Sequence, residues 1–352
     1  MKKIIHILLP SFGLLLLGYL VGKLGLHNII ENFVVMRWWF PAILILACLW
    51  HITNSIAWRF AFPPGAFRPQ LRSLFMAKLA GEAINQLTPL ANIGGEPLKA
   101  ILLKHQSPVS RSLASVVVNK AAQILTGLGF TLVGLGLIIA QWDLPQAIPL
   151  PIKVGLGALG ISLLALTTAL YRKKHTLFSS VLSILRTAGL VDLAERQMDR
   201  AVRTDANISQ FYGDHKARFG IVMFFHSLGW LLGACETYVI LAALGAGIDF
   251  EIAFLITALT VVINSLFFFM PSNIGILEGG QVFLFLTLGL NPSIGLSLGI
   301  VKRMRKIFWI SIGWLFLTKL SRSVGSSMPT QLGRTKAASE SELETRQSVT
   351  LR

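Results

Sequence analysis

Negative charge is scarce in this sequence, and charge of either sign is uncommon. Only 14% of the 352 residues are charged while 53% are hydrophobic, and 16 acidic residues stand against 32 basic ones. With a mean hydropathy of +0.66, the chain is too apolar for an ordinary soluble fold and is expected to be an integral membrane protein. The formal net charge of +16 does not indicate nucleic-acid binding, because the basic residues cluster in short segments between apolar runs. The membrane surface is the expected partner of this charge.

Cysteine is equally rare, and the common motifs of catalysis are missing. Cys48 and Cys235 both lie inside apolar runs, with no CxxC or Cys/His spacing, so we interpret them as packing residues and not as redox groups or metal ligands. No Gly-rich nucleotide loop, HExxH motif or nucleophile elbow is present. The sequence therefore argues against ATP-driven pumping and most known catalysis, and it predicts neither a metal site nor a cofactor.

Several apolar runs approach the roughly 20 residues that a membrane-spanning helix needs. They cover residues 4–21, 38–58, 113–140, 152–171, 219–244, 252–270 and 293–318. We therefore predict an all-α fold, a polytopic membrane helical bundle of about eight crossings. The integral membrane domain is expected to occupy residues 1–320. A disordered polar tail is expected at 321–352, where the sequence is rich in Ser, Thr, Glu and Arg and loses its periodicity.

Basic residues predict which side of the membrane each end faces. Lys2 and Lys3 place the N-terminus in the cytoplasm, and the first apolar run is expected to stay as a span because no convincing cleavage site follows it. The stretches 59–78 and 99–111 are also rich in Lys and Arg, so both are expected on the cytoplasmic side. Residues 172–218 carry charges of both signs at helical spacing, which predicts a cytoplasmic helical hairpin on the membrane surface.

One polar, glycine-rich stretch occurs twice. Pro89, the triplet Asn92-Ile93-Gly94 and Glu96 recur about 180 residues later as Pro271, Asn273-Ile274-Gly275 and Glu278, and each copy is preceded by Ile-Asn, at 84–85 and 263–264. Proline removes a backbone donor and glycine frees the backbone, so each copy is predicted to be a broken or re-entrant segment. At membrane depth such breaks are tolerated only against protein or water, and in transporters paired breaks mark the binding site. We expect the two copies of this internal repeat to meet and line one cavity.

The final apolar run carries four cations, Lys302, Arg303, Arg305 and Lys306, about ten residues from its start. Each cation costs about 2.5 to 3.5 kcal/mol at the centre of a membrane helix, so something must solvate or pair it. We favour a lining for the predicted cavity. The alternative is that the charges mark the cytoplasmic end of a helix, which would leave only residues 307–318 beyond them, about half of a span.

Two further helices carry polar stripes. Ser112, Ser115, Asn119, Gln123 and Thr126 share one face of the helix after the first copy, with Lys120 beside it, and His226, Gly229, Gly233 and Glu236 share a face of the helix at 219–244. A polar stripe inside a span faces other helices or water, so hydrogen bonding between helices and a cavity lining are equally open. Glu236 would be a counter-ion for a buried base or a proton carrier.

Each copy of the repeat contains one carboxylate beside glycines. Glu96 and Glu278 can accept hydrogen bonds from freed amides, cap the helix that follows, pair with Lys120 and Arg303, or face a substrate. Glu82 and Asn85 precede the first break and can line its entrance. The candidate substrate-binding residues are Glu82, Asn85, Asn92, Gly94, Gly95, Glu96, Lys120, Asn273, Gly275, Glu278, Lys302, Arg303, Arg305 and Lys306.

These motifs resemble the flippase-like transmembrane domain of the lysylphosphatidylglycerol synthase family. The resemblance rests on Glu82, Asn85, Pro89 and the Ile-Gly-Gly-Glu-Pro-Leu-Lys run at 93–99, with Pro271, Ile274-Gly275, Glu278-Gly279-Gly280 and the basic cluster after Pro292. It implies movement of modified phospholipids between leaflets, a bacterial inner (cytoplasmic) membrane, and a stand-alone branch of the hopanoid-associated kind. Where the family commonly has an arginine after the first motif, this chain has Lys120, which lacks the guanidinium geometry that grips phosphate. The synthase's soluble aminoacyl-transferase domain is not expected in this chain, so the resemblance does not imply aminoacylation.

The sequence thus predicts a lipid translocase that holds an anionic headgroup on its buried cations, with membrane lipids as its partners. Two alternatives remain open. One is a membrane-embedded lipid-modifying enzyme with Glu96 or Glu278 as its base. The other is a non-catalytic subunit of a separate lipid-modifying enzyme, docked through the 172–218 hairpin.

Overall fold

The computed structural model of the chain describes residues 34, 36–65, 68–87, 94–140, 158, 161, 165, 202–206, 208–211, 213–267 and 275–325. The regular elements in these ranges are all helices: α3 (Phe40–Ala61), α4 (Leu71–Leu87), α5 (Gly95–Leu102), α6 (Val109–Ala140), α10 (Lys216–Ala243), α11 (Phe250–Leu266), α12 (Ile276–Thr287) and α13 (Pro292–Gly325). The predicted all-α membrane bundle is confirmed. The expected span at 4–21, nearly all of the run at 152–171, most of the 172–218 hairpin and the tail beyond 325 lie outside the described residues, as do Asn92 and Asn273.

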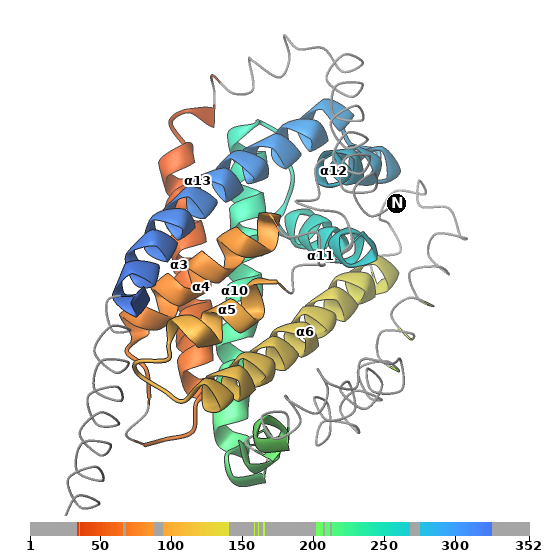
Figure 1. Ribbon diagram of the computed structural model, residues 1–352. Coiled ribbons are helices and arrows are strands. Elements are labelled where there is room, and N and C mark those ends of the chain that lie inside the picture. The colour runs from red at the N-terminus through yellow and green to blue at the C-terminus, as the bar shows by residue number, and fades with distance from the viewer. Residues whose placement is uncertain are drawn as a thin grey trace, which may run out of the picture.

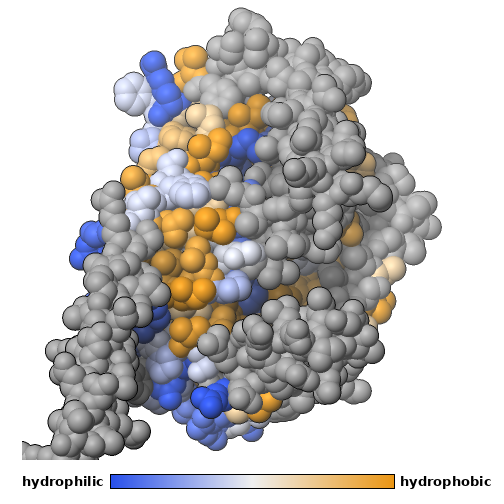
Figure 2. All heavy atoms as spheres, in the orientation of Figure 1, coloured by the Kyte–Doolittle hydropathy of each residue, from blue (hydrophilic) through white to orange (hydrophobic). Residues whose placement is uncertain are grey.

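Three described helices are long and apolar enough to cross a membrane, namely α3, α6 and α10. They contain 22, 32 and 28 residues, which at 1.5 Å per residue is at least about 33 Å, against a hydrocarbon core of about 30 Å. Large apolar side chains stay exposed on them: Ile221, Phe224, Leu228 and Leu231 recur every third or fourth residue of α10. Figure 2 shows a hydrophobic area with hydrophilic residues above and below it, as expected of a surface that faces lipid.

Both copies of the repeat have the same order of elements: a helix, a break, a short helix and a long helix. These are α4, α5 and α6 in the first copy, and α11, α12 and α13 in the second. In each copy the helices before and after the break pack antiparallel. Asn85 contacts Gly95 and Gly81 contacts Lys99 in the first, while in the second Thr260 contacts Gln281 and Ile263 contacts Gly280. Each copy is therefore a helical hairpin followed by a long helix.

The two copies interlock by exchanging their long helices, so that α13 packs on α4 and α6 packs on α11 (Figure 1). Glycines permit both crossings. A Cβ on Gly313 would collide with the carbonyl oxygen of Leu79, and one on Gly134 would collide with Ala258. Both partners are displaced by the same 179 positions, from 79 to 258 and from 134 to 313. The internal repeat is thus also a repeat of tertiary contacts.

The core lies where α3 and α10 pack against these hairpins. One apolar cluster gathers Trp58, Phe62 and Leu74 near the end of α3, and another gathers Ile240, Leu255 and Phe285 near the end of α10. The polar groups described next lie on the helices that this packing brings together.

Candidate functional site

The first hairpin is held together by Asn85. Its Oδ1 accepts a hydrogen bond from the Gly95 N–H at 2.5 Å, and the side chain is only 6% exposed. A Cβ on Gly95 would collide with the carbonyl oxygen of Gly81, so the two helices approach too closely for any side chain between them. Gly94 immediately precedes α5. In the structure, Asn85, Gly94 and Gly95 shape the hairpin.

Glu96, at the start of α5, lies between two lysines. Lys99 Nζ is 2.8 Å from its Oε1 and Lys120 Nζ, on α6, is 3.9 Å from the same atom. Asn85 Nδ2 also approaches this oxygen, at 3.4 Å. The pairing predicted between Glu96 and Lys120 is present, although Lys99 makes the closer contact. The Lys120 side chain is 45% exposed against 12% for Lys99, so Lys120 is the more accessible cation.

A second cluster connects α4 to α3. Lys78 Nζ lies 2.6 Å from Glu82 Oε1, 2.9 Å from His51 Nδ1 and 4.5 Å from the centre of the Trp50 ring. Because an ammonium can only donate, Nδ1 of His51 is the acceptor and the ring proton belongs on Nε2. The sequence placed Lys78 with the cytoplasmic stretch 59–78, but α4 begins at Leu71 and buries this lysine, which is 7% exposed. A cation with a carboxylate four residues later can be buried as a pair, which the charge of the stretch alone does not predict.

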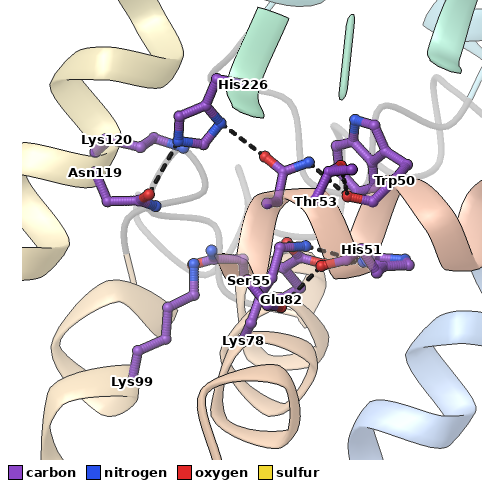
Figure 3. A network of polar contacts seen from close by, with 12 residues as sticks. Trp50, His51, Thr53, Ser55, Lys78, Glu82, Lys99, Asn119, Lys120 and His226 are labelled. Atoms are coloured by element: carbon purple, nitrogen blue, oxygen red, sulfur yellow. Dashed lines mark hydrogen bonds and ion pairs between the residues drawn. The ribbon is translucent and has the colours of Figure 1, made fainter. Parts of the chain in front are cut away.

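His226 of α10 bridges the polar stripe of α6 to α3. Its Nδ1 lies 2.8 Å from Asn54 Oδ1 and its Nε2 lies 2.9 Å from Asn119 Oδ1. Figure 3 shows this bridge above the Lys78 cluster, with Lys99 and Lys120 extending toward the same region from α5 and α6. Two other residues of the stripe bond to tryptophans of neighbouring helices, Ser115 to Trp58 and Thr126 to Trp230. The polar stripe of α6 was expected either to hydrogen-bond other helices or to line a cavity. Ser115, Asn119 and Thr126 do the former.

The second hairpin is organised around Glu278. Gly275 precedes α12 with φ of +75°, a backbone conformation that favours glycine, and its N–H donates to Glu278 Oε2 at 3.0 Å. Arg303 of α13 donates to both oxygens of this fully buried carboxylate, with Nη2 2.8 Å from Oε2. Both the predicted cap and the predicted pairing with Arg303 are present. A two-point arginine–carboxylate contact fixes distance and orientation together.

The four cations of α13 occupy the eleventh to fifteenth positions of a continuous 34-residue helix. They therefore lie within the helix, and the alternative that they mark its end is wrong. Arg305 pairs with Glu236 of α10, the counter-ion role expected for that glutamate. Among the described residues, Lys302 and Lys306 have no hydrogen bond or ion pair. Lys306 lies within electrostatic reach of Glu278 in one copy and Glu82 in the other.

The two hairpins and the helices against them therefore carry an excess of positive charge. Seven cations (Lys78, Lys99, Lys120, Lys302, Arg303, Arg305 and Lys306) accompany four carboxylates (Glu82, Glu96, Glu236 and Glu278). In the part of the chain that the structure describes, no group of His, Cys, Asp and Glu is arranged to hold a metal ion. The arrangement is suited to receiving an anion.

Sequence reasoning missed His51, Lys78, Lys99 and Asn54 as members of this network. The available signal was the polar group at 51–55 within an otherwise apolar run, where His, Thr, Asn and Ser occur within five residues. Buried polar residues in a span require partners. Which partners they find depends on helix packing.

Comparison with known proteins agrees with these motifs. The family model described as the lysylphosphatidylglycerol synthase transmembrane region matches residues 4–313. A UPF0104 membrane protein of Pyrococcus horikoshii is 22% identical over 304 residues, which cover 81% of this chain and 88% of that protein. Another, from Methanothermobacter thermautotrophicus, is 23% identical over 257 residues, covering 68% of this chain and 72% of that protein. No solved structure matches. The family match supports a lipid-related role in a membrane.

Proposed function

Because the chain belongs to the family of the lysylphosphatidylglycerol synthase transmembrane region, we propose that it moves a lipid with an anionic headgroup between the two leaflets of a membrane. The observation that carries the proposal is the excess of cations among the two hairpins, above all Lys302 and Lys306 within α13. An unpaired cation at the centre of a membrane helix costs about 2.5 to 3.5 kcal/mol, and a phosphate that reaches it would offset that cost.

The ion pairs give the cations different roles. Arg303 and Arg305 are each held by a carboxylate, so they fix the electrostatic environment. Lys302 and Lys306 are free to rotate toward a headgroup and away again, and a compact ammonium on a flexible stem suits transient contact. Lys306 lies within electrostatic reach of a carboxylate in each copy, so a headgroup passing from one hairpin to the other could meet it. The acyl chains would stay in the surrounding lipid.

The proposal includes an orientation, with the N-terminus in the cytoplasm of a bacterial cell and the protein in its inner membrane. Arg59 in the last turn of α3, Arg68 and Arg72 after it, and Lys319 near the end of α13 support this orientation, because cytoplasmic connections are enriched in Lys and Arg.

The enzyme alternative is weakened by the surroundings of Glu278. Both of its oxygens accept hydrogen bonds from Arg303, one also accepts the Gly275 N–H, and the side chain is fully buried. A general base must reach the proton that it removes, and this carboxylate is occupied on both sides.

A scrambling assay tests the proposal. Full-length protein is reconstituted in phosphatidylglycerol vesicles with a trace of fluorescent phosphatidylglycerol, and dithionite quenching reports the fraction of the labelled lipid that has crossed.

The double variant Lys302→Gln, Lys306→Gln removes both free charges and leaves every carboxylate paired. It should slow crossing by about tenfold or more. The control Lys319→Gln removes an exposed cation from the same helix and should leave the rate within about twofold. An unchanged rate in the double variant would refute the proposal, and mass spectrometry showing a chemically altered headgroup would favour the enzyme.

A further inference from the structure

Three arginines gather where α3 ends and α10 begins, apart from the clusters described above. Arg59 lies in the last turn of α3, Arg68 in the connection to α4, and Arg218 in the first turn of α10. The guanidinium carbons of Arg68 and Arg218 lie 5.1 and 5.3 Å from the centre of the Phe60 ring. These ends of α3 and α10 lie together at the lower side of the molecule in Figure 1.

The charges of these arginines are not balanced by the described part of the chain. There, no carboxylate lies within 4 Å of any of the three guanidinium groups, and the only hydrogen bond they make runs from Arg218 Nη2 to the Phe62 carbonyl oxygen, at 2.9 Å. The Nε atoms of Arg59, Arg68 and Arg218 are all buried without an acceptor. Burial and the charge of Arg59 lower the pKa of Arg68, as expected for like charges held together.

A stripe of exposed apolar side chains starts beside the arginines. The exposed apolar side chains of α10 begin one turn beyond Arg218, with Ile221 and Phe224, and continue to Leu231. At 100° per residue they occupy the helix face next to that of Arg218. The buried Nε donors of the arginines suit a phosphate, and the adjacent apolar stripe of α10 suits the hydrocarbon chains of the same phospholipid.

We propose that Arg59, Arg68 and Arg218 form a second lipid site, which binds the phosphate of an anionic phospholipid whose acyl chains lie along Ile221, Phe224, Leu228 and Leu231. The site shares no residue with the hairpin clusters, so it does not depend on translocation. A small pocket lined by Ala61 and Pro63 adds two further basic side chains, Arg111 and His215, around the same end of α3. Guanidinium groups suit this role because their paired donors match phosphate oxygens.

Lipid binding to the full-length protein in detergent micelles tests this site. Fluorescent phosphatidylglycerol is titrated against the wild type, the triple variant Arg59→Gln, Arg68→Gln, Arg218→Gln, and the control Lys216→Gln. The control removes an exposed cation two residues from Arg218. We expect the triple variant to bind about tenfold more weakly or worse, since charged hydrogen bonds are lost, and the control to stay within about twofold. Inorganic phosphate at millimolar concentration should not displace the lipid.

Equal affinity of the triple variant and the wild type would overturn the proposal. Displacement of the lipid by inorganic phosphate alone would overturn the lipid assignment in favour of a soluble anion. The single variant Arg68→Gln removes a side chain that makes no hydrogen bond in the described structure, so it provides the same comparison if the triple variant does not fold. For it we expect a loss of about threefold to tenfold.

Discussion

Glu278 joins α12 to α13 through Arg303 while it also caps its own helix. One of its oxygens accepts both Arg303 Nη2 at 2.8 Å and the Gly275 N–H at 3.0 Å. The repeated motif and the cations of the last helix, which are about 25 residues apart in the sequence, are therefore one structural unit. The Glu278 carboxylate thus caps α12 and also holds α13 beside it through Arg303.

Replacing Glu278 with Gln should destabilise the protein strongly. The change keeps the shape of the side chain but leaves the Arg303 guanidinium without its counter-charge in a buried place, and breaking a buried pair in this way costs about 3 to 5 kcal/mol. Thermal unfolding of the purified protein in detergent measures the effect. Glu251→Gln removes an exposed carboxylate at the start of α11 and should change stability by about 1 kcal/mol or less. Equal unfolding temperatures for Glu278→Gln and the wild type would show that the pair does not hold the hairpin.

Because α4 and α5 approach closely at Gly95, an added methyl group there should destabilise the protein, whereas one at Gly129 on α6 should not. Gly95→Ala would push a methyl group into the carbonyl oxygen of Gly81, so the hairpin would have to open and the Asn85 hydrogen bond would weaken. Overpacking of this kind costs about 1 to 3 kcal/mol. Gly129→Ala on α6 has no atom within 4 Å of the added carbon and should be neutral or stabilising by up to about 1 kcal/mol. Unfolding temperatures of the two variants should therefore move in opposite directions, and a stable Gly95→Ala variant would contradict the packing of this hairpin.

Local sequence features predicted most of the helices and the repeat, because apolar runs and Pro/Gly breaks act over short distances. Glu278 and Arg303 could be paired from the sequence because Glu278 belongs to the repeated motif and Arg303 is a cation inside an apolar run, where it needs a partner. The contacts of His51 and Lys78 could not, because they join helices whose crossing is set by packing elsewhere, for example by Gly313 against Leu79. The charge of the stretch 59–78 predicts a side of the membrane for Lys78 but not its burial, which depends on Glu82 and His51.

His226 should matter for stability because its two ring nitrogens contact amides on two other helices. His226→Ala leaves Asn54 and Asn119 without this bridge inside the bundle, and each unsatisfied buried group costs about 1 to 3 kcal/mol. His105→Ala is the matched control, since His105 is exposed in the connection between α5 and α6. The comparison is again made by thermal unfolding in detergent. If both histidine variants unfold at the wild-type temperature, the bridge contributes nothing to the packing of α3, α6 and α10.

Lys99 and Lys120 share the carboxylate of Glu96, yet their replacement should have separate effects. Lys99 is 2.8 Å from Glu96 and 12% exposed, so Lys99→Gln removes the nearest counter-charge of a largely buried carboxylate and should lower stability by about 1 to 3 kcal/mol. Lys120 is 3.9 Å away and 45% exposed, so Lys120→Gln should change stability by about 1 kcal/mol or less. Because Lys120 is the more accessible cation at the first hairpin, its loss should instead slow lipid scrambling severalfold. Unfolding and scrambling measured on the same two preparations separate the roles: a Lys120→Gln variant that unfolds early and scrambles normally would mean that Lys120 serves the hairpin and not the lipid.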